Sequence, residues 1–213
     1  MMAVVLLARA GRFVTTVVRH AVPVGGVFGA DWHPATAIAV YWFESILLVL
    51  ATAILCALFA RRTPPAEIAR AGIEPGTVLI FHLGSLMVFG GFFGGLLLIM
   101  FGNGHFDEPM RWDELRGAVE LMFVIVGVGL VLDLWGFHRF TVASMRARVD
   151  ACMVRWGLFW LLGFVGTFVI GFTGRAALFF GLFSGLKITF ESWATLARVF
   201  GWRSLKERAE ATS

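Results

Sequence analysis

The feature that most constrains this chain is a series of apolar runs, each long enough to cross a lipid bilayer. A transmembrane helix needs about 20 consecutive, mostly apolar residues. Charged residues, prolines or glycines separate the five runs that meet this length, which are 34–60, 76–101, 117–138, 156–174 and 176–200. We therefore expect an all-α, polytopic membrane protein in which each run forms one helix.

The composition excludes an ordinary soluble protein. Apolar residues (AVILMFWYC) make up 59% of the chain, charged residues only 15%, and the mean hydropathy is +0.83. Soluble domains average about 45–50% apolar and about 25% charged residues. The connections between the runs are too short for a water-soluble domain, so we expect a single transmembrane domain over 1–213.

A sixth, weaker run covers 13–30 and contains Arg19, His20 and Pro23. If it crosses and both termini are cytoplasmic, the inner connections carry twelve Lys and Arg and the outer ones three. Such a bias is typical of inner-membrane proteins. We therefore expect about six helices in a bacterial inner membrane with both termini cytoplasmic. The alternative for the first run is an amphipathic helix lying on the membrane surface.

The sequence lacks the motifs of nucleic-acid-binding proteins, metal sites and hydrolases. The net charge of +4 comes from scattered residues rather than a basic stripe, so we expect no nucleic-acid partner. The two cysteines have no partner at a metal-binding spacing, and the chain has no GxSxG or HExxH motif. We expect neither a catalytic site nor a bound cofactor or metal, and membrane lipids and other transmembrane proteins as partners.

Three charged residues of mixed sign fall at one depth on three expected helices. Glu44, Lys187 and Arg19 each lie about ten or eleven residues, or about 15 Å, from the outer boundary. Ionisable groups at this depth cost about 2.5–3.5 kcal/mol each on insertion scales. Pairing inside the bundle lowers that cost, so we expect Glu44 to face Lys187, Arg19 or both.

A second layer of ionisable residues lies closer to the cytoplasmic side and comprises His82, Asp133 and Glu191. Glu191 follows Lys187 by four residues and so shares its helix face. The two layers together are either a polar path for protons or a small ion, or an ion-pair network that fixes helix register.

His82 and His138 fall at a similar depth on different helices. Two histidines so placed suit the axial positions of a haem iron, which is an alternative to hydrogen-bonded core histidines.

Glycines recur at the four-residue spacing that lets membrane helices approach closely. We expect helix packing at Gly90, Gly91, Gly94, Gly95, Gly181 and Gly185.

Several short motifs together resemble one family. The pattern is P-x-x-G-V near the N-terminus, Y-W-x-E, a helix beginning F-x-x-H, and a late K-x-x-x-D/E. The matching residues are Pro23, Gly26, Val27, Tyr41, Trp42, Glu44, His82, Gly84, Lys187 and Glu191. This pattern resembles DUF6498, a family of bacterial multi-pass membrane proteins of unknown function. Ser45 stands where that family has Asn, and Leu83 where it has Tyr. The resemblance implies a six-helix membrane protein and supplies no activity.

Two functions fit these features. The first is a non-enzymatic accessory subunit that packs its Gly-rich and Phe-rich faces against a larger membrane complex, such as a respiratory or photosynthetic assembly. The second is a small transporter or proton/ion conductor that uses the buried charges.

Overall fold

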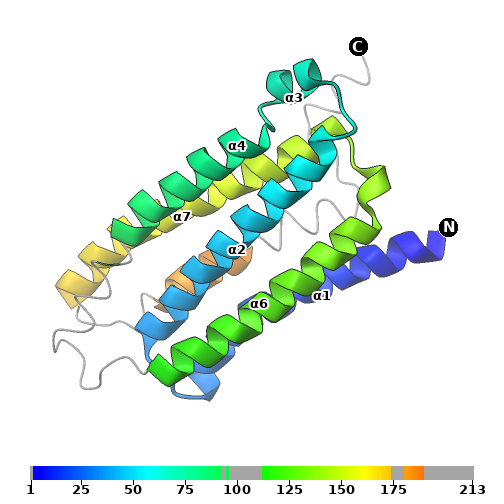
Figure 1. The fold of residues 1–213 in the computed structure, drawn as a ribbon. Helices are drawn as coiled ribbons and strands as arrows, with labels where there is room; N and C mark the ends of the chain where they lie inside the picture. The colour runs from blue at the N-terminus through cyan, green and yellow to red at the C-terminus, as the bar shows by residue number, and fades with distance from the viewer. Residues whose placement is uncertain (1, 93–94, 96–111, 174–179, 190–213) are drawn as a thin grey trace, which may run out of the picture.

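The computed structural model describes residues 2–92, 95, 112–173 and 180–189. The described part of the chain is helical and contains no β-strand. Long helices lie side by side, with α2 (Pro34–Ala60) in the middle (Figure 1). The helix that begins with α4 (Pro75–Thr77) lies with α7 (Val142–Thr173) on one side, and α1 (Met2–Gly29) lies with α6 (Trp112–Trp135) on the other. The fold is therefore all-α.

The first half of the described chain contains α1 (Met2–Gly29), α2 (Pro34–Ala60) and the short α3 (Pro65–Ala71). The short α4 (Pro75–Thr77) continues without a break into two π-helical stretches, η1 (Val78–Leu83) and η2 (Leu86–Gly90). The second half contains α6 (Trp112–Trp135), the 3₁₀ turn η3 (Phe137–Arg139), α7 (Val142–Thr173) and a helical segment at 180–189.

Prolines and one glycine mark several helix ends. Pro34, Pro65 and Pro75 each open a helix, where the missing amide hydrogen is not needed. Gly72 ends α3 with φ of 63°, a left-handed conformation that glycine adopts without strain. The segment 61–75, expected as a connection, therefore contains a helix of its own.

Two helices begin before the apolar runs that predicted them. α1 begins at Met2 rather than near residue 13, and α7 begins at Val142 rather than near residue 156. The charges within 142–155 hid the first part of α7, because hydropathy responds to polarity and an exposed helix face tolerates charge. Arg146 and Asp150, four residues apart and exposed, form an ion pair of 3.7 Å on that face.

Three helices of the described chain are long and apolar enough to cross a membrane: Thr36–Ala60, Pro65–Val88 and Trp112–Trp135. Phe13–Gly29 is a shorter apolar helix. These helices are compatible with a membrane location. The last expected helix, 176–200, is described only at 180–189.

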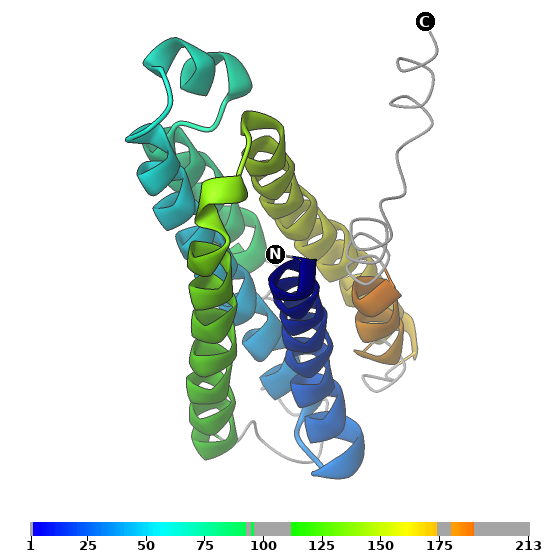
Figure 2. The same cartoon turned by 90° about the vertical axis from the view of Figure 1, so that its right-hand side faces the viewer.

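α2 forms most of the packing because its neighbours cover it along its whole length. Near its beginning, Val40 packs with Leu115 and Met122 of α6. Near its end, Cys56 packs with Met145 of α7, in a cluster that also includes Ile68 of α3. Figure 2 shows α1 between α6 and the segment 180–189, where Phe28 meets Phe180 with ring centroids 6.0 Å apart.

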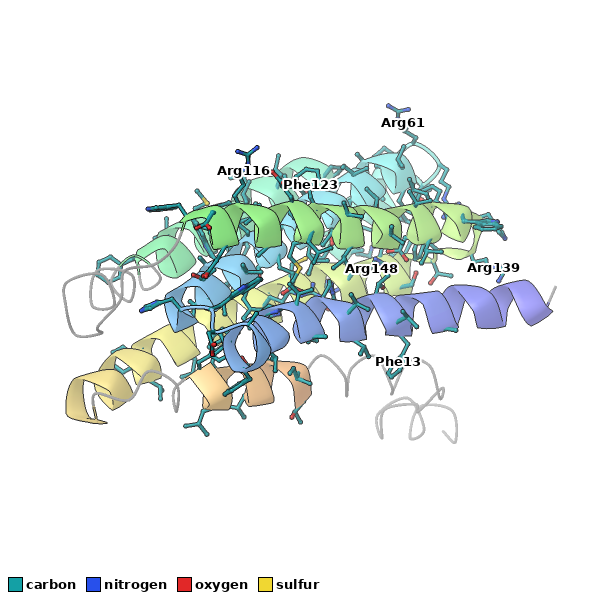
Figure 3. The ribbon with its side chains drawn as sticks, turned by 90° about the horizontal axis from the view of Figure 1, so that it is seen from below. Phe13, Arg61, Arg116, Phe123, Arg139 and Arg148 are labelled. Atoms are coloured by element: carbon teal, nitrogen blue, oxygen red, sulfur yellow. The ribbon has the colours of Figure 1, made fainter. Side chains whose placement is uncertain are left out.

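One outward face of α6 is apolar. Phe123, Val124 and Val131 of α6 are each more than half exposed. Figure 3 shows Phe13 and Phe123 standing away from the bundle, as Arg61 and Arg116 also do. Large apolar side chains facing outward are expected where lipid or another membrane protein covers the surface.

A tight reversal joins α1 to α2 and depends on Gly26. Asp31 has φ of 51°, and the backbone N–H of Trp32 donates a hydrogen bond of 2.9 Å to the carbonyl of Gly26. The Trp32 ring thereby folds against the end of α1, where a Cβ at position 26 would overlap it. Gly26 is thus required for close approach rather than for flexibility.

We predict that Gly26→Ala destabilises the protein by about 1–3 kcal/mol, the usual cost of forcing an extra carbon into a packed site. Gly25→Ala is the matched control, because a Cβ there meets no atom of the described chain within 4 Å. Thermal unfolding in detergent measures both variants. Equal melting temperatures for the two would contradict the close contact between Gly26 and Trp32.

Candidate functional site

A buried carboxylate between two cations is the most polar feature of the described interior. Glu44 of α2 is fully buried. Lys187 of the segment 180–189 donates a hydrogen bond from Nζ to Glu44 Oε2 at 3.0 Å. Arg19 of α1 places Nε 3.4 Å from Glu44 Oε1. Three helices that are distant in sequence therefore meet at one carboxylate, and we call these three residues the charged centre.

Both cations are themselves withdrawn from the surface. The side chain of Lys187 is 4% exposed and that of Arg19 is 9% exposed. Removing such charges from water is costly, and close opposite charges with further hydrogen bonds offset that cost. Arg19 gains one such contact from Thr16 Oγ1, one helical turn away at 3.5 Å. The charged centre is thus a connected polar site inside an otherwise apolar bundle.

An aromatic cluster borders the charged centre. The Tyr41 ring lies under Lys187, with Nζ 4.8 Å from the ring centroid, a distance at which the ring attracts a cation. Phe183 packs against the same ring at 5.6 Å between centroids, and His20 lies 6.1 Å away. The Tyr41 ring therefore contributes a further attraction to the Lys187 ammonium group beside the charged centre.

Two buried hydroxyl groups belong to the elements that form this region. Ser184 Oγ and Thr36 Oγ1 have no hydrogen-bond partner among the described residues, and both side chains are nearly or wholly buried. Ser184 precedes Lys187 by three residues, so the two share a face of their helix. A buried hydroxyl group is a hydrogen-bonding group that a bound polar solute can use.

Ser45, by contrast, uses its hydroxyl within its own helix. Its Oγ donates to the carbonyl of Tyr41 at 2.9 Å, one turn earlier on α2. This bond satisfies the Ser45 side chain beside Glu44 without reaching another helix.

Asp133 belongs to a separate ion pair. Its Oδ1 lies 2.6 Å from an Nη atom of Arg148 on α7, near the end of the bundle that carries α3. Asp133 lies 21 residues from the start of α6, whereas Glu44 lies 10 residues from the start of α2. The two helices run in the same direction (Figure 1), so Asp133 lies roughly 16 Å farther along the bundle than Glu44.

The structure therefore brings together three of the six residues expected in the buried charge network: Arg19, Glu44 and Lys187. Asp133 pairs with Arg148, and His82 contacts Phe81. Glu191 lies outside the described residues.

His82 occupies the first π-helical stretch. Its ring is buried and meets the Phe81 ring edge-on at 5.4 Å between centroids. π-helical turns are rare and concentrate at functional sites because they shift the backbone hydrogen-bond register. Trp42 Nε1, on α2, donates a hydrogen bond of 3.4 Å to the carbonyl of Leu86 in the second stretch. This bond connects the π-helical region to α2.

His138 is exposed in η3, and its Nε2 accepts a hydrogen bond of 3.2 Å from Arg139 Nε. Axial ligation of a haem by His82 and His138 stays a prediction. Among the described residues, no group of three or more His, Cys, Asp or Glu side chains is arranged to hold a metal ion.

The glycines expected to pack helices differ in their surroundings. A Cβ at Gly91 would lie 3.8 Å from the Trp42 ring, an ordinary contact distance. A Cβ at Gly95, Gly181 or Gly185 would meet no described atom within 4 Å. Gly90 is helical within η2, and Gly94 lies outside the described residues.

Arginines at the α3 end of the bundle hold the connections, a role that sequence reasoning missed. Arg62 donates to the carbonyls of Phe137 and Phe140 at 2.8 and 3.0 Å. Arg146 donates to the carbonyl of Ala71 at 3.0 Å. The adjacent arginines in the sequence signal a basic connection, but nothing in the sequence identifies the carbonyls that they bind.

A family model described as "Family of unknown function (DUF6498)" matches residues 8–211. The chain belongs to the DUF6498 family. No curated protein and no solved structure matches it. The DUF6498 match covers all three residues of the charged centre and, like the family description, assigns no activity.

We predict that breaking the charged centre destabilises the protein and that removing both partners restores part of the loss. Glu44→Gln or Lys187→Met alone should cost about 3–5 kcal/mol, because each leaves a buried charge without its partner. The double variant should cost less than the sum of the two. Unfolding in detergent measures the coupling.

The exposed Arg116–Glu120 pair, at 2.9 Å on α6, is the matched control. Its replacement should change stability little, since exposed pairs contribute up to about 1 kcal/mol. Additive effects of Glu44→Gln and Lys187→Met would contradict a direct ion pair.

Proposed function

We propose that this DUF6498 chain is a small transporter or ion conductor, and that the charged centre handles its solute. The observation that supports this proposal is the burial of Glu44 between Arg19 and Lys187. Apolar side chains of similar size often pack helices as stably as a buried ion pair does. A chemistry that needs charge is therefore a better reason for these residues than helix packing alone.

We further propose six membrane-spanning helices in a bacterial inner membrane, with both termini in the cytoplasm. The arginine distribution supports this orientation, since most basic residues fall on the connections assigned to the inner side. The basic connections 61–75 and 136–141 also lie at the same end of the bundle (Figure 1). The apolar helices Thr36–Ala60, Pro65–Val88 and Trp112–Trp135 are compatible with that location.

The second candidate is an accessory subunit of a larger membrane complex. It is favoured by the exposed apolar face of α6, where Phe123, Val124 and Val131 are 65%, 62% and 61% exposed. Such a face suits a neighbouring transmembrane protein as well as it suits lipid. An accessory subunit would remain with its complex in mild detergent and would move no solute alone.

We predict that the purified protein in liposomes moves a charged solute, and that Lys187→Met lowers the rate at least about tenfold. A buried cation that contacts the solute contributes more than the roughly 1.4 kcal/mol that corresponds to a factor of ten. Arg116→Gln, on the exposed pair, should leave the rate unchanged. Gel filtration is the check that both variants are folded.

Transport by Lys187→Met at the normal rate would contradict the proposed role of the charged centre. No transport by the wild-type protein, together with recovery of a defined partner complex from native membranes, would favour the accessory subunit.

We predict that a membrane-impermeant thiol reagent fails to label Ala3→Cys and Thr212→Cys in intact cells and labels both after permeabilisation. Cytoplasmic termini are shielded by the intact membrane, whereas Asn103→Cys, in the expected outer connection, should react without permeabilisation. Both native cysteines are buried and give a low background. Labelling of one terminus in intact cells would contradict an even number of crossings.

A further inference from the structure

We infer that the charged centre binds a small monocarboxylate and that the Glu44 side chain occupies the solute's position until the solute displaces it. This inference rests on the proposed transport function and names its solute class. The structure already contains a carboxylate bound at this position, namely that of Glu44.

The two cations bind the two oxygens of the Glu44 carboxylate separately. Lys187 Nζ is 3.0 Å from Oε2, and Arg19 Nε is 3.4 Å from Oε1. The cations come from different helices, neither of which carries the carboxylate. A side-chain rotation of Glu44 would therefore leave both donors on their own helices, where another carboxylate can bind them. Arginine and lysine together supply eight N–H donors and no acceptor, so both side chains suit a carboxylate.

Ser184 adds a donor suited to a small anion. Its hydroxyl group is 3% exposed, has no hydrogen-bond partner among the described residues, and lies one turn from Lys187 on the same helix face. The Tyr41 and Phe183 rings border Lys187 and offer an apolar surface to a short alkyl group. A carboxylate with one or two carbons fits this combination of charged, hydroxyl and aromatic groups.

Displacement requires no covalent step. The entering carboxylate takes over both ion pairs, and a proton that enters with it neutralises the displaced Glu44 carboxylate, so the net charge of the buried site stays the same. Because Glu44 is tethered, its effective concentration at the site is in the millimolar range or above. The solute therefore competes with a strong internal ligand, which keeps its apparent affinity low and makes its release rapid.

The test is binding of acetate to the full chain in detergent, with and without the Glu44 carboxylate. Thermal unfolding is followed across acetate concentrations, with chloride at equal ionic strength as the reference, because a ligand that binds the folded state raises the melting temperature. Glu44→Gln and Glu44→Ala should lower the half-saturating acetate concentration at least about tenfold. Glu44→Ala combined with Lys187→Met should abolish the effect.

A Glu44→Ala protein that is unstable by itself provides a second measurement. Acetate or formate added during purification should restore its folding, because the free carboxylate takes the vacated position. The same concentration of chloride should not do so. Absence of rescue would overturn the inference, and so would equal acetate affinity in wild-type protein and Glu44→Gln.

Flux measurements on the same proteins separate this inference from the proposed function. Cation transport by wild-type protein, with no acetate binding by Glu44→Ala, would overturn the inference and leave the transporter proposal standing. Acetate binding by Glu44→Ala, with no flux of any ion through any variant, would support the carboxylate site and contradict transport. Acetate flux that rises in Glu44→Gln would support both.

Discussion

The buried carboxylate of Glu44 is the interaction on which the rest of this arrangement depends. It draws α1 and the segment 180–189 to the same point on α2, although these elements stand at opposite ends of the chain. The packing around it is apolar, and apolar contacts are non-directional. The Lys187–Glu44 hydrogen bond at 3.0 Å is directional, and the Arg19–Glu44 ion pair at 3.4 Å lies beside it, so both join particular faces of the three helices.

The sequence predicted the elements better than their ends. The apolar composition of 34–60 identifies α2, because the run is apolar on every face and long enough to span a bilayer. Counting residues from the expected membrane boundary placed Arg19, Glu44 and Lys187 at one depth, which is a property of helical rise. The same count could not predict the ion pair between Asp133 and Arg148. That pair depends on the start of α7, where exposed charges obscure the helical pattern.

Other features required coordinates because they depend on contacts between distant segments. The constraint at Gly26 comes from the Trp32 ring, which returns to α1 only because Asp31 adopts a left-handed conformation. The bonds from Arg62 to Phe137 and Phe140 join residues about 75 positions apart. The π-helical stretches around His82 and Leu86 follow from no single residue. Periodicity and composition describe one segment at a time and therefore miss all three.

The most direct test of the buried ion pair is to measure how close positions 44 and 187 lie in the membrane. Both positions are changed to cysteine in a chain whose native Cys56 and Cys152 are alanine, and a short bifunctional thiol reagent is added to native membranes. The account predicts efficient intramolecular cross-linking of positions 44 and 187. It predicts little cross-linking of 44 with the neighbouring position 186, because Leu186 is 52% exposed and Lys187 is buried. Equal cross-linking of 44 to 186 and 187, or none to 187, would contradict the buried carboxylate.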